Sequence, residues 1–217
     1  PEGKVVFLQN FADDAILDRA ANAGADATDR ENPYLLFFGR LSVEKGVDTL
    51  LRAFDVALPN LPQNMRLVVV GDGPDAADFK ALASSLGCAS RIEFAGYQTG
   101  GALQAYVERA SLAIASSRWR ENMPYSIVEA FAAGTPVVGT DIGGIPELID
   151  EGKTGFICEP GDVPSMADAI SRGTSAFLDR STYSRLQSNC RSYVMENCSR
   201  EKFMSDLVNL YKESIDG

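Results

Sequence analysis

The chain has 217 residues, of which 45% are hydrophobic, so we expect one large α/β domain with a substantial core rather than a disordered chain. Its formal net charge of -10 repels polyphosphate at long range, which disfavours a nucleic-acid-binding role. Because it contains no histidine, histidine bases, Ser-His triads and histidine-ligated metals are excluded within it.

Cysteine usage and hydropathy indicate an intracellular protein. The four cysteines, Cys88, Cys158, Cys190 and Cys198, form no C-x-x-C pair, and no secretory leader is visible. We therefore expect ordinary cytoplasmic thiols. No apolar run approaches the roughly 20 residues that a membrane-spanning helix needs.

Predicted strands and helices alternate along most of the chain. Strands are predicted at 5–8, 34–38, 66–70, 91–95, 112–115, 136–139 and 155–158. Helices are predicted at 47–58, 75–86 and 102–109, from near Pro124 to 133, briefly from Pro146, and throughout 164–217. The sequence leaves open whether the acidic segment 13–29 forms a helix.

The predicted strands are continuous apolar runs without polar alternation. Such strands, separated by helices, are typical of a parallel sheet covered on both faces. Right-handed crossovers make it a doubly wound sheet. Ligands then bind beyond the carboxyl ends of the strands, so the segments that follow strands are the candidate site.

The first such segment is the charged loop 39–46. Gly39 permits a sharp turn after the strand, and Arg40 and Lys45 place two cations at the sheet edge. A guanidinium and an ammonium there can neutralise a diphosphate, although solvated surface positions explain the spacing equally well.

Two carboxylates flank the next candidate, a helix start. Glu121 and Glu129 lie on either side of Pro124, which favours the first turn of a helix. Free amides at 125–127 would then form a phosphate site, with Glu129 within reach of a ribose diol and Glu121 near sugar hydroxyls. The alternative for the pair alone is that Glu129 complements the helix start and Glu121 is solvated.

Two glycine-rich segments are less informative. Gly71-Asp72-Gly73-Pro74 follows a strand, but alanine occupies position 76, so G-x-G-x-x-G is absent. An ordinary strand-to-helix turn is favoured there, and an NAD-dependent oxidoreductase is disfavoured. The segment 140–147 is either a lining of the cleft or a structural turn.

Taken together, five ordered segments resemble the nucleotide-sugar-binding domain of the glycosyl transferases group 1 family, which has the GT-B fold. They cover about residues 30–160: Gly39-Arg40-Leu41 with Lys45-Gly46; 70–74; Phe94-Ala95-Gly96; Glu121 through Glu129-Ala130; and 134–138 with 143–147. The resemblance implies a Rossmann-like doubly wound parallel sheet in one domain, 1–217, with extra C-terminal helices over 164–217.

The resemblance also implies roles for single residues. Arg40 and Lys45 would hold the donor diphosphate and stabilise the departing nucleotide, and Glu121 would contact the transferred sugar. These three are the candidate catalytic residues. Glu129 would bind the ribose, and the base would lie against Gly96 and Tyr97. The other candidate substrate-binding residues are Gly39, Asn122, Met123, Pro124, Tyr125 and Ser126.

The chain departs from the family in two ways. Asn122 replaces the family's usual glycine, which narrows the sugar pocket or adds a hydrogen-bond donor. The family's N-terminal, acceptor-binding domain is absent, so we expect the isolated domain to be inactive. In the family the terminal helix, here with Phe203, Leu207, Leu210 and Tyr211 on one face, packs toward that missing domain.

The expected function is therefore retaining transfer from a nucleoside-diphosphate sugar, with UDP-sugar first, to a glycan or lipid-linked glycan. The family is described as using front-face transfer, which depends on stabilising the leaving diphosphate. No D-x-D pair occurs, so neither a metal nor another cofactor is expected. The longer enzyme would be cytoplasmic, with peripheral contact at the inner face of the membrane through the missing domain. A GT-B nucleotide-sugar epimerase and a non-catalytic nucleotide-binding module are the alternatives.

Overall fold

The computed structural model describes residues 11–12, 14–22 and 27–216, so the strand predicted at 5–8 lies outside the described residues. The described chain forms a six-stranded sheet in the order β3-β2-β1-β4-β5-β6. Its strands are β1 (Tyr34–Phe38), β2 (Arg66–Val70), β3 (Ile92–Gly96), β4 (Leu112–Ala115), β5 (Val137–Thr140) and β6 (Gly155–Cys158). Every pairing is parallel.

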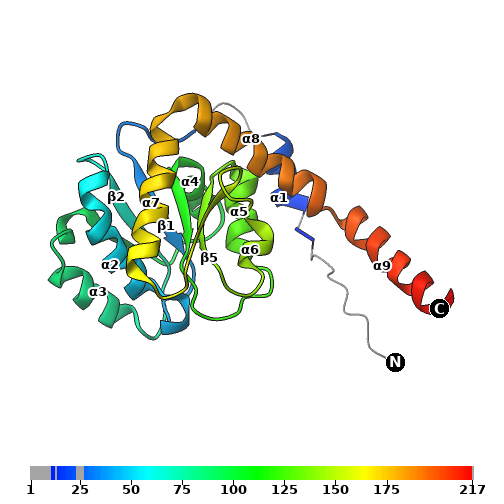
Figure 1. Cartoon of the computed structure of the whole chain (residues 1–217), viewed down its shortest axis with the longest axis horizontal. Coiled ribbons are helices and arrows are strands. Elements are labelled where there is room, and N and C mark those ends of the chain that lie inside the picture. Colours follow the sequence, from blue (N-terminus) through cyan, green and yellow to red (C-terminus); the bar gives the residue numbers. More distant parts are fainter. Residues whose placement is uncertain (1–10, 13, 23–26, 217) are drawn as a thin grey trace.

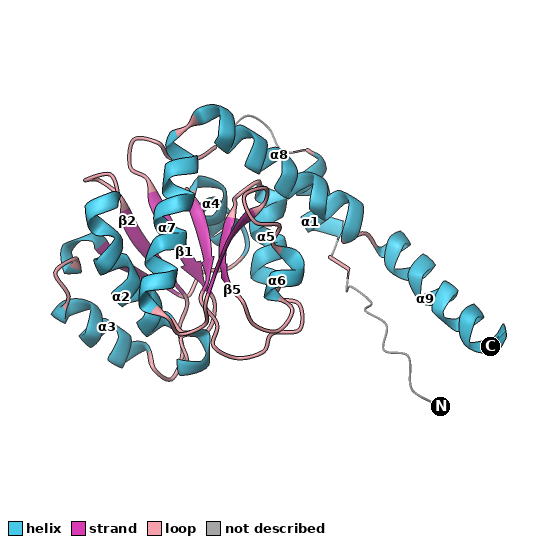
Figure 2. Ribbon diagram, in the orientation of Figure 1, coloured by secondary structure: helices cyan, strands magenta, loops and turns pink. Residues whose placement is uncertain are grey.

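Helices cover both faces of this sheet (Figures 1 and 2). Along β1, Leu35 and Phe37 belong to one apolar cluster, whereas Leu36 and Phe38 belong to the other. The first cluster includes residues of α2 (Val47–Ala57), α3 (Ala76–Ser85) and α7 (Val163–Leu178). The second includes residues of α1 (Asp14–Ala21), α4 (Gly100–Arg109), α5 (Tyr125–Ala133), α6 (Ile145–Leu148) and α8 (Arg180–Asn197). The central strands β1, β2, β4 and β5 carry buried apolar runs because they face helices on both sides, whereas the edge strand β3 contains the exposed Glu93.

The end of the chain is helical, as predicted, and α9 (Arg200–Asp216) projects from the sheet domain (Figure 1). Asp162 and Asp179 start α7 and α8, since their carboxylates accept hydrogen bonds from the amides of Ser165 (2.7 Å) and Thr182 (2.6 Å). The fold class predicted from the sequence, a doubly wound parallel sheet with extra C-terminal helices, is confirmed.

The doubtful helix in the acidic segment is present. It forms as α1, which packs on α5 and α8 and buries Ile16 and Ala20, four residues apart on one face. Eight residues make a marginal helix in isolation. Tertiary packing therefore decides this element, and local propensity alone left it open.

Candidate functional site

The candidate site lies where the winding of the sheet reverses, between β1 and β4. A cavity of about 470 Å³ opens there, beyond the carboxyl ends of these two strands. The loop after β1 and the loop between β4 and α5 form its two walls. Eight of the residues predicted for substrate binding line it: Gly39, Arg40, Lys45, Glu121, Met123, Pro124, Tyr125 and Ser126.

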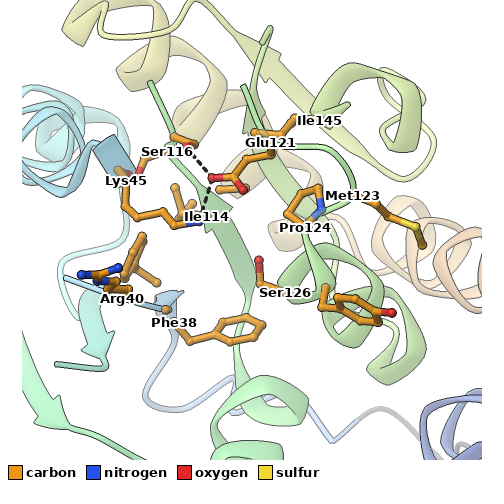
Figure 3. Close-up of a pocket in the computed structure, with 15 residues that line it drawn as sticks. Phe38, Arg40, Lys45, Ile114, Ser116, Glu121, Met123, Pro124, Ser126 and Ile145 are labelled. Carbon is orange, nitrogen blue, oxygen red and sulfur yellow. Dashed lines mark hydrogen bonds and ion pairs between the residues drawn. The ribbon is translucent and has the colours of Figure 1, made fainter. Parts of the chain in front are cut away.

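Two of the predicted catalytic residues, one from each wall, are in contact. The Lys45 ammonium donates to Glu121 Oε1 at 2.7 Å (Figure 3). Their side chains are 32% and 21% exposed, so the pair is partly shielded from water and is stronger than a fully solvated ion pair. The ammonium has three hydrogens, and two remain for a ligand.

Arg40 lines the same cavity with an exposed side chain. Figure 3 shows its guanidinium turned away from Glu121. Within the described part of the chain, it has no ion-pair partner. Arg40 thus offers a full positive charge to a ligand, whereas the charge of Lys45 is already balanced by Glu121.

Close backbone packing brings the two walls together. Gly46 has a φ of 65°, and a Cβ added there would lie 2.0 Å from the carbonyl oxygen of Ser116. The Ser116 hydroxyl donates to the carbonyl of Lys45 at 2.7 Å, and the Arg118 amide donates to the carbonyl of Glu44 at 2.8 Å. The loop carrying Lys45 is therefore tied directly to the segment after β4.

A pair of glycines supports Glu121 from behind. The Gly144 amide donates to the carbonyl of Glu121 at 2.7 Å. A Cβ on Gly144 would lie 1.8 Å from the carbonyl oxygen of Asn122, and one on Gly143 would lie 2.5 Å from that of Glu121. The segment 140–147 is thus a close backbone support for the Glu121 loop.

The start of α5 differs in one detail from the prediction. Pro124 precedes the helix as expected, but the Ile127 amide donates to the Pro124 carbonyl at 3.0 Å. The expectation that this amide is free for phosphate was wrong, because the first turn closes through an i to i−3 bond. The Tyr125 hydroxyl donates to the carbonyl of Phe11 at 3.2 Å, on the side of α1.

A second cavity, of about 320 Å³, continues the first toward β2 and β3. The two share Phe38, Gly39 and Ser126 as lining residues, so they form one groove across the sheet edge. Tyr97 and Glu129 line this second part. We call the cavity with Arg40, Lys45 and Glu121 the charged half and the cavity with Tyr97 and Glu129 the open half.

Two predicted substrate-binding residues line neither half. Gly96 ends β3, and its carbonyl accepts a hydrogen bond from the Gly71 amide at 2.8 Å. Asn122 is exposed, and its carbonyl lies against Gly144. In the structure, both residues shape the backbone beside the groove.

Sequence reasoning missed two serines of the charged half. Ser116 and Ser117 line its cavity, and the Ser117 hydroxyl donates to Glu121 Oε1 at 2.8 Å. Their signal was available, since they directly follow the predicted strand 112–115, where ligand-binding residues are expected.

The single tryptophan lies in the same loop. Trp119 is 70% exposed, so its indole lies at the surface and not in the core. Its carbonyl is 3.3 Å from the Ser117 hydroxyl, so its backbone is next to the charged half.

Outside the groove, the cysteine thiols are buried, and the acidic and cysteine side chains of the described residues form no metal-binding cluster. All four cysteines are free and buried, and burial raises the pKa of the Cys88 and Cys158 thiols to about 12. Residues 11–12, 14–22 and 27–216 contain no cluster of three acidic or cysteine side chains that could bind a metal ion.

Comparison with known proteins gives the family. The family model of the glycosyl transferases group 1 matches residues 18–192. The chain belongs to this family. Among similar curated proteins, an alpha-D-kanosaminyltransferase from Streptomyces kanamyceticus is 27% identical over 98% of the chain and 55% of its own length. An N-acetyl-alpha-D-glucosaminyl L-malate synthase from Bacillus anthracis is 26% identical over 97% of the chain and 54% of its length. The chain spans about half the length of these relatives.

Solved structures agree on the fold of this glycosyltransferase-family chain. A glycosyltransferase from Rickettsia africae has a TM-score of 0.78 at 22% identity, covering 96% of the chain and 56% of that protein. HepE from Anabaena, crystallised with UDP, has a TM-score of 0.72 at 21% identity, covering 93% of the chain and 54% of HepE. In the described residues, no helix is long and apolar enough to cross a membrane.

Proposed function

We propose that the chain is the donor-binding domain of a retaining glycosyltransferase and binds a nucleoside-diphosphate sugar along the groove. The observation that carries the proposal is the Lys45–Glu121 contact at the switch point of the sheet. The contact supports the proposal, because it sets a cation that would bind phosphate beside a carboxylate that would accept from sugar hydroxyls. A sugar bonded directly to a diphosphate needs two such groups close to each other.

The charged half takes the diphosphate and the sugar. Arg40 presents its guanidinium fork, and the two free hydrogens of the Lys45 ammonium reach a phosphate oxygen. The start of α5 at Pro124 adds the positive end of a helix dipole. On its side away from Lys45, Glu121 accepts hydrogen bonds from hydroxyls of the transferred sugar.

The open half takes the nucleoside. Glu129 lies one turn into α5 and accepts from the ribose diol, while the base lies over the exposed ring of Tyr97. HepE was crystallised with UDP and with UDP-glucose, which supports a uridine donor.

Transfer breaks the bond between the anomeric carbon and the diphosphate oxygen, and the bond electrons stay on that oxygen. Arg40, Lys45 and the helix dipole stabilise the negative charge that develops there. The acceptor hydroxyl then bonds to the same face of the sugar and gives its proton to the departing phosphate. We propose that the reaction is metal-independent, because the chain has no D-x-D pair to hold a divalent metal ion at the diphosphate.

The acceptor site belongs to a second domain outside this chain. The relatives' length supports this, since the chain covers 55% and 54% of the two described above. We propose that the longer enzyme glycosylates a glycan or a lipid-linked glycan at the cytoplasmic face of a membrane, and that the isolated chain binds donor without transferring sugar.

A thermal-shift screen of the chain against UDP, GDP, ADP and their glucose conjugates tests the proposal. At one hundred times its dissociation constant, a ligand stabilises the fold by about 2.7 kcal/mol, or roughly 5–11 °C for a domain of this size. We expect UDP and UDP-glucose to give the largest shifts. Stabilisation by NAD but by no nucleoside diphosphate would contradict the proposal. Sugar transfer by the longer protein separates a transferase from an epimerase or a binding module.

A further inference from the structure

Two adjacent serines at the end of β4 hold the two members of the Lys45–Glu121 pair. The Ser116 hydroxyl donates to the Lys45 carbonyl at 2.7 Å, and the Ser117 hydroxyl donates to Glu121 Oε1 at 2.8 Å. Both serines are buried, at 1% and 4% exposure. Their hydroxyls are therefore committed to protein partners rather than to bulk water.

Ser117 has one hydrogen and three acceptors within reach. The carbonyls of Glu44 and Trp119 lie 3.1 and 3.3 Å from its oxygen, whereas Glu121 Oε1 lies at 2.8 Å and is charged. A carboxylate is the strongest of these acceptors, so the hydrogen goes to Glu121. The backbone of Ser117 is itself fixed, because the buried Thr140 hydroxyl donates to the Ser117 carbonyl at 2.7 Å.

Both contacts of the Glu121 carboxylate fall on the same oxygen. Lys45 and Ser117 approach Oε1, and Figure 3 shows the other oxygen on the side of Pro124, away from the dashed contacts. A carboxylate held at one oxygen by two donors has a defined plane. Its second oxygen is then aimed into the cavity as an acceptor.

We propose that Ser117 is a positioning residue for sugar recognition. By donating to Oε1, it orients Oε2 of Glu121 to accept a hydrogen bond from a hydroxyl of the transferred sugar. This inference rests on the proposed function, because it needs a sugar at Glu121. Ser117 acts through Glu121 and not on the diphosphate.

The first test compares UDP and UDP-glucose by calorimetry on Ser117→Ala. We expect UDP-glucose to bind roughly tenfold more weakly, while UDP binds within about twofold of the unsubstituted protein. Ser111→Ala is the matched control. Ser111 is buried just before the other end of β4, and its hydroxyl lacks a hydrogen-bond partner in the described structure. Equal losses for UDP and UDP-glucose in Ser117→Ala would overturn the positioning role.

A double-mutant cycle shows whether Ser117 acts through Glu121. In a Glu121→Ala background, Ser117→Ala should cause no further loss of UDP-glucose affinity, since the carboxylate that it orients is gone. A full additional tenfold loss would mean that Ser117 acts on the ligand or the fold by another route, and would overturn the proposal.

Ligand-free melting separates this inference from the proposed function. Ser117→Ala should lower the melting temperature by about 2–6 °C, and by clearly less in the Glu121→Ala background. Equal shifts in both backgrounds would refute the Ser117–Glu121 coupling, whatever binds. If the coupling is present but no nucleotide sugar stabilises the protein, the contact stands, and both the proposed function and the sugar-positioning role fail.

Discussion

The two halves of the groove are built differently. In the charged half, Lys45 and Ser117 both donate hydrogen bonds to Glu121 before any ligand arrives. In the open half, Tyr97 is 74% exposed, and much of the lining is backbone and apolar surface. The carboxylate proposed to contact the sugar is therefore held by protein hydrogen bonds, whereas the base would meet an exposed surface. Discrimination among sugars should be strict, and discrimination among bases weaker.

Removing Lys45 should have the largest effect on binding. Lys45→Ala removes a charged hydrogen bond to phosphate, worth roughly 1.5–3 kcal/mol, or about 10- to 150-fold in the affinity for UDP. It also leaves Glu121 without its counter-ion beside the diphosphate. Uridine, which has no phosphate, should bind as before. Calorimetry with both ligands checks this, and equal losses would place Lys45 away from the phosphates. Arg40→Lys keeps the charge but loses the fork geometry of the guanidinium, so the affinity for UDP should fall less than in Lys45→Ala.

Substitutions of the two glutamates should affect the two halves of the groove differently. Glu129→Ala should weaken UDP and UDP-glucose alike, by roughly 1.5–3 kcal/mol for a hydrogen bond to a carboxylate. Glu121→Ala should leave UDP nearly unchanged and weaken only UDP-glucose. Titrations of both variants with both ligands measure this. The same pattern in the two variants would remove the assignment of sugar and ribose.

Adding a Cβ at the glycine that supports the Glu121 loop should damage the charged half alone. Gly144→Ala puts a Cβ 1.8 Å from the Asn122 carbonyl oxygen, so the Glu121 loop must shift, at a cost of about 1–3 kcal/mol in stability. The variant should no longer bind UDP-glucose more tightly than UDP. Gly101→Ala is the control, because a Cβ there has nothing within 4 Å and position 101 lies within α4. Normal UDP-glucose binding by a stable Gly144→Ala protein would contradict the role of this support.

The smallest expected effect is optical. Trp119 is exposed beside Ser117, so its fluorescence should change as UDP-glucose is titrated in and the loop tightens. The change should survive EDTA, weaken with salt because two cations contribute, and shrink in Lys45→Ala. A signal that requires Mg²⁺ would contradict the metal-independent proposal.

Much of this molecule could be predicted from local patterns. The apolar runs at 34–38, 66–70 and 112–115 predicted the sheet, and Pro124 predicted the start of α5. The helix α1 was uncertain, because its stability comes from packing on α5 and α8 rather than from its own residues.

The internal structure of the site was less accessible to sequence reasoning. Lys45 and Glu121 are 76 residues apart, and only the neighbouring positions of β1 and β4 bring them together. Nothing local to Ser117 indicates that its single hydrogen goes to Glu121. Asn122 was expected in the sugar pocket, but it is exposed with its carbonyl against Gly144, a contact that depends on the turn after β5.

The central claim is that the sugar diphosphate lies across the charged half of the groove. A crystal structure of the chain with UDP-glucose tests it most directly. We expect phosphate oxygens within hydrogen-bond distance of Lys45 Nζ and the Arg40 guanidinium. A glucose hydroxyl should lie on Oε2 of Glu121, and the ribose should lie at Glu129. A complex whose diphosphate lies outside this groove, or whose glucose makes no contact with Glu121, would contradict the account.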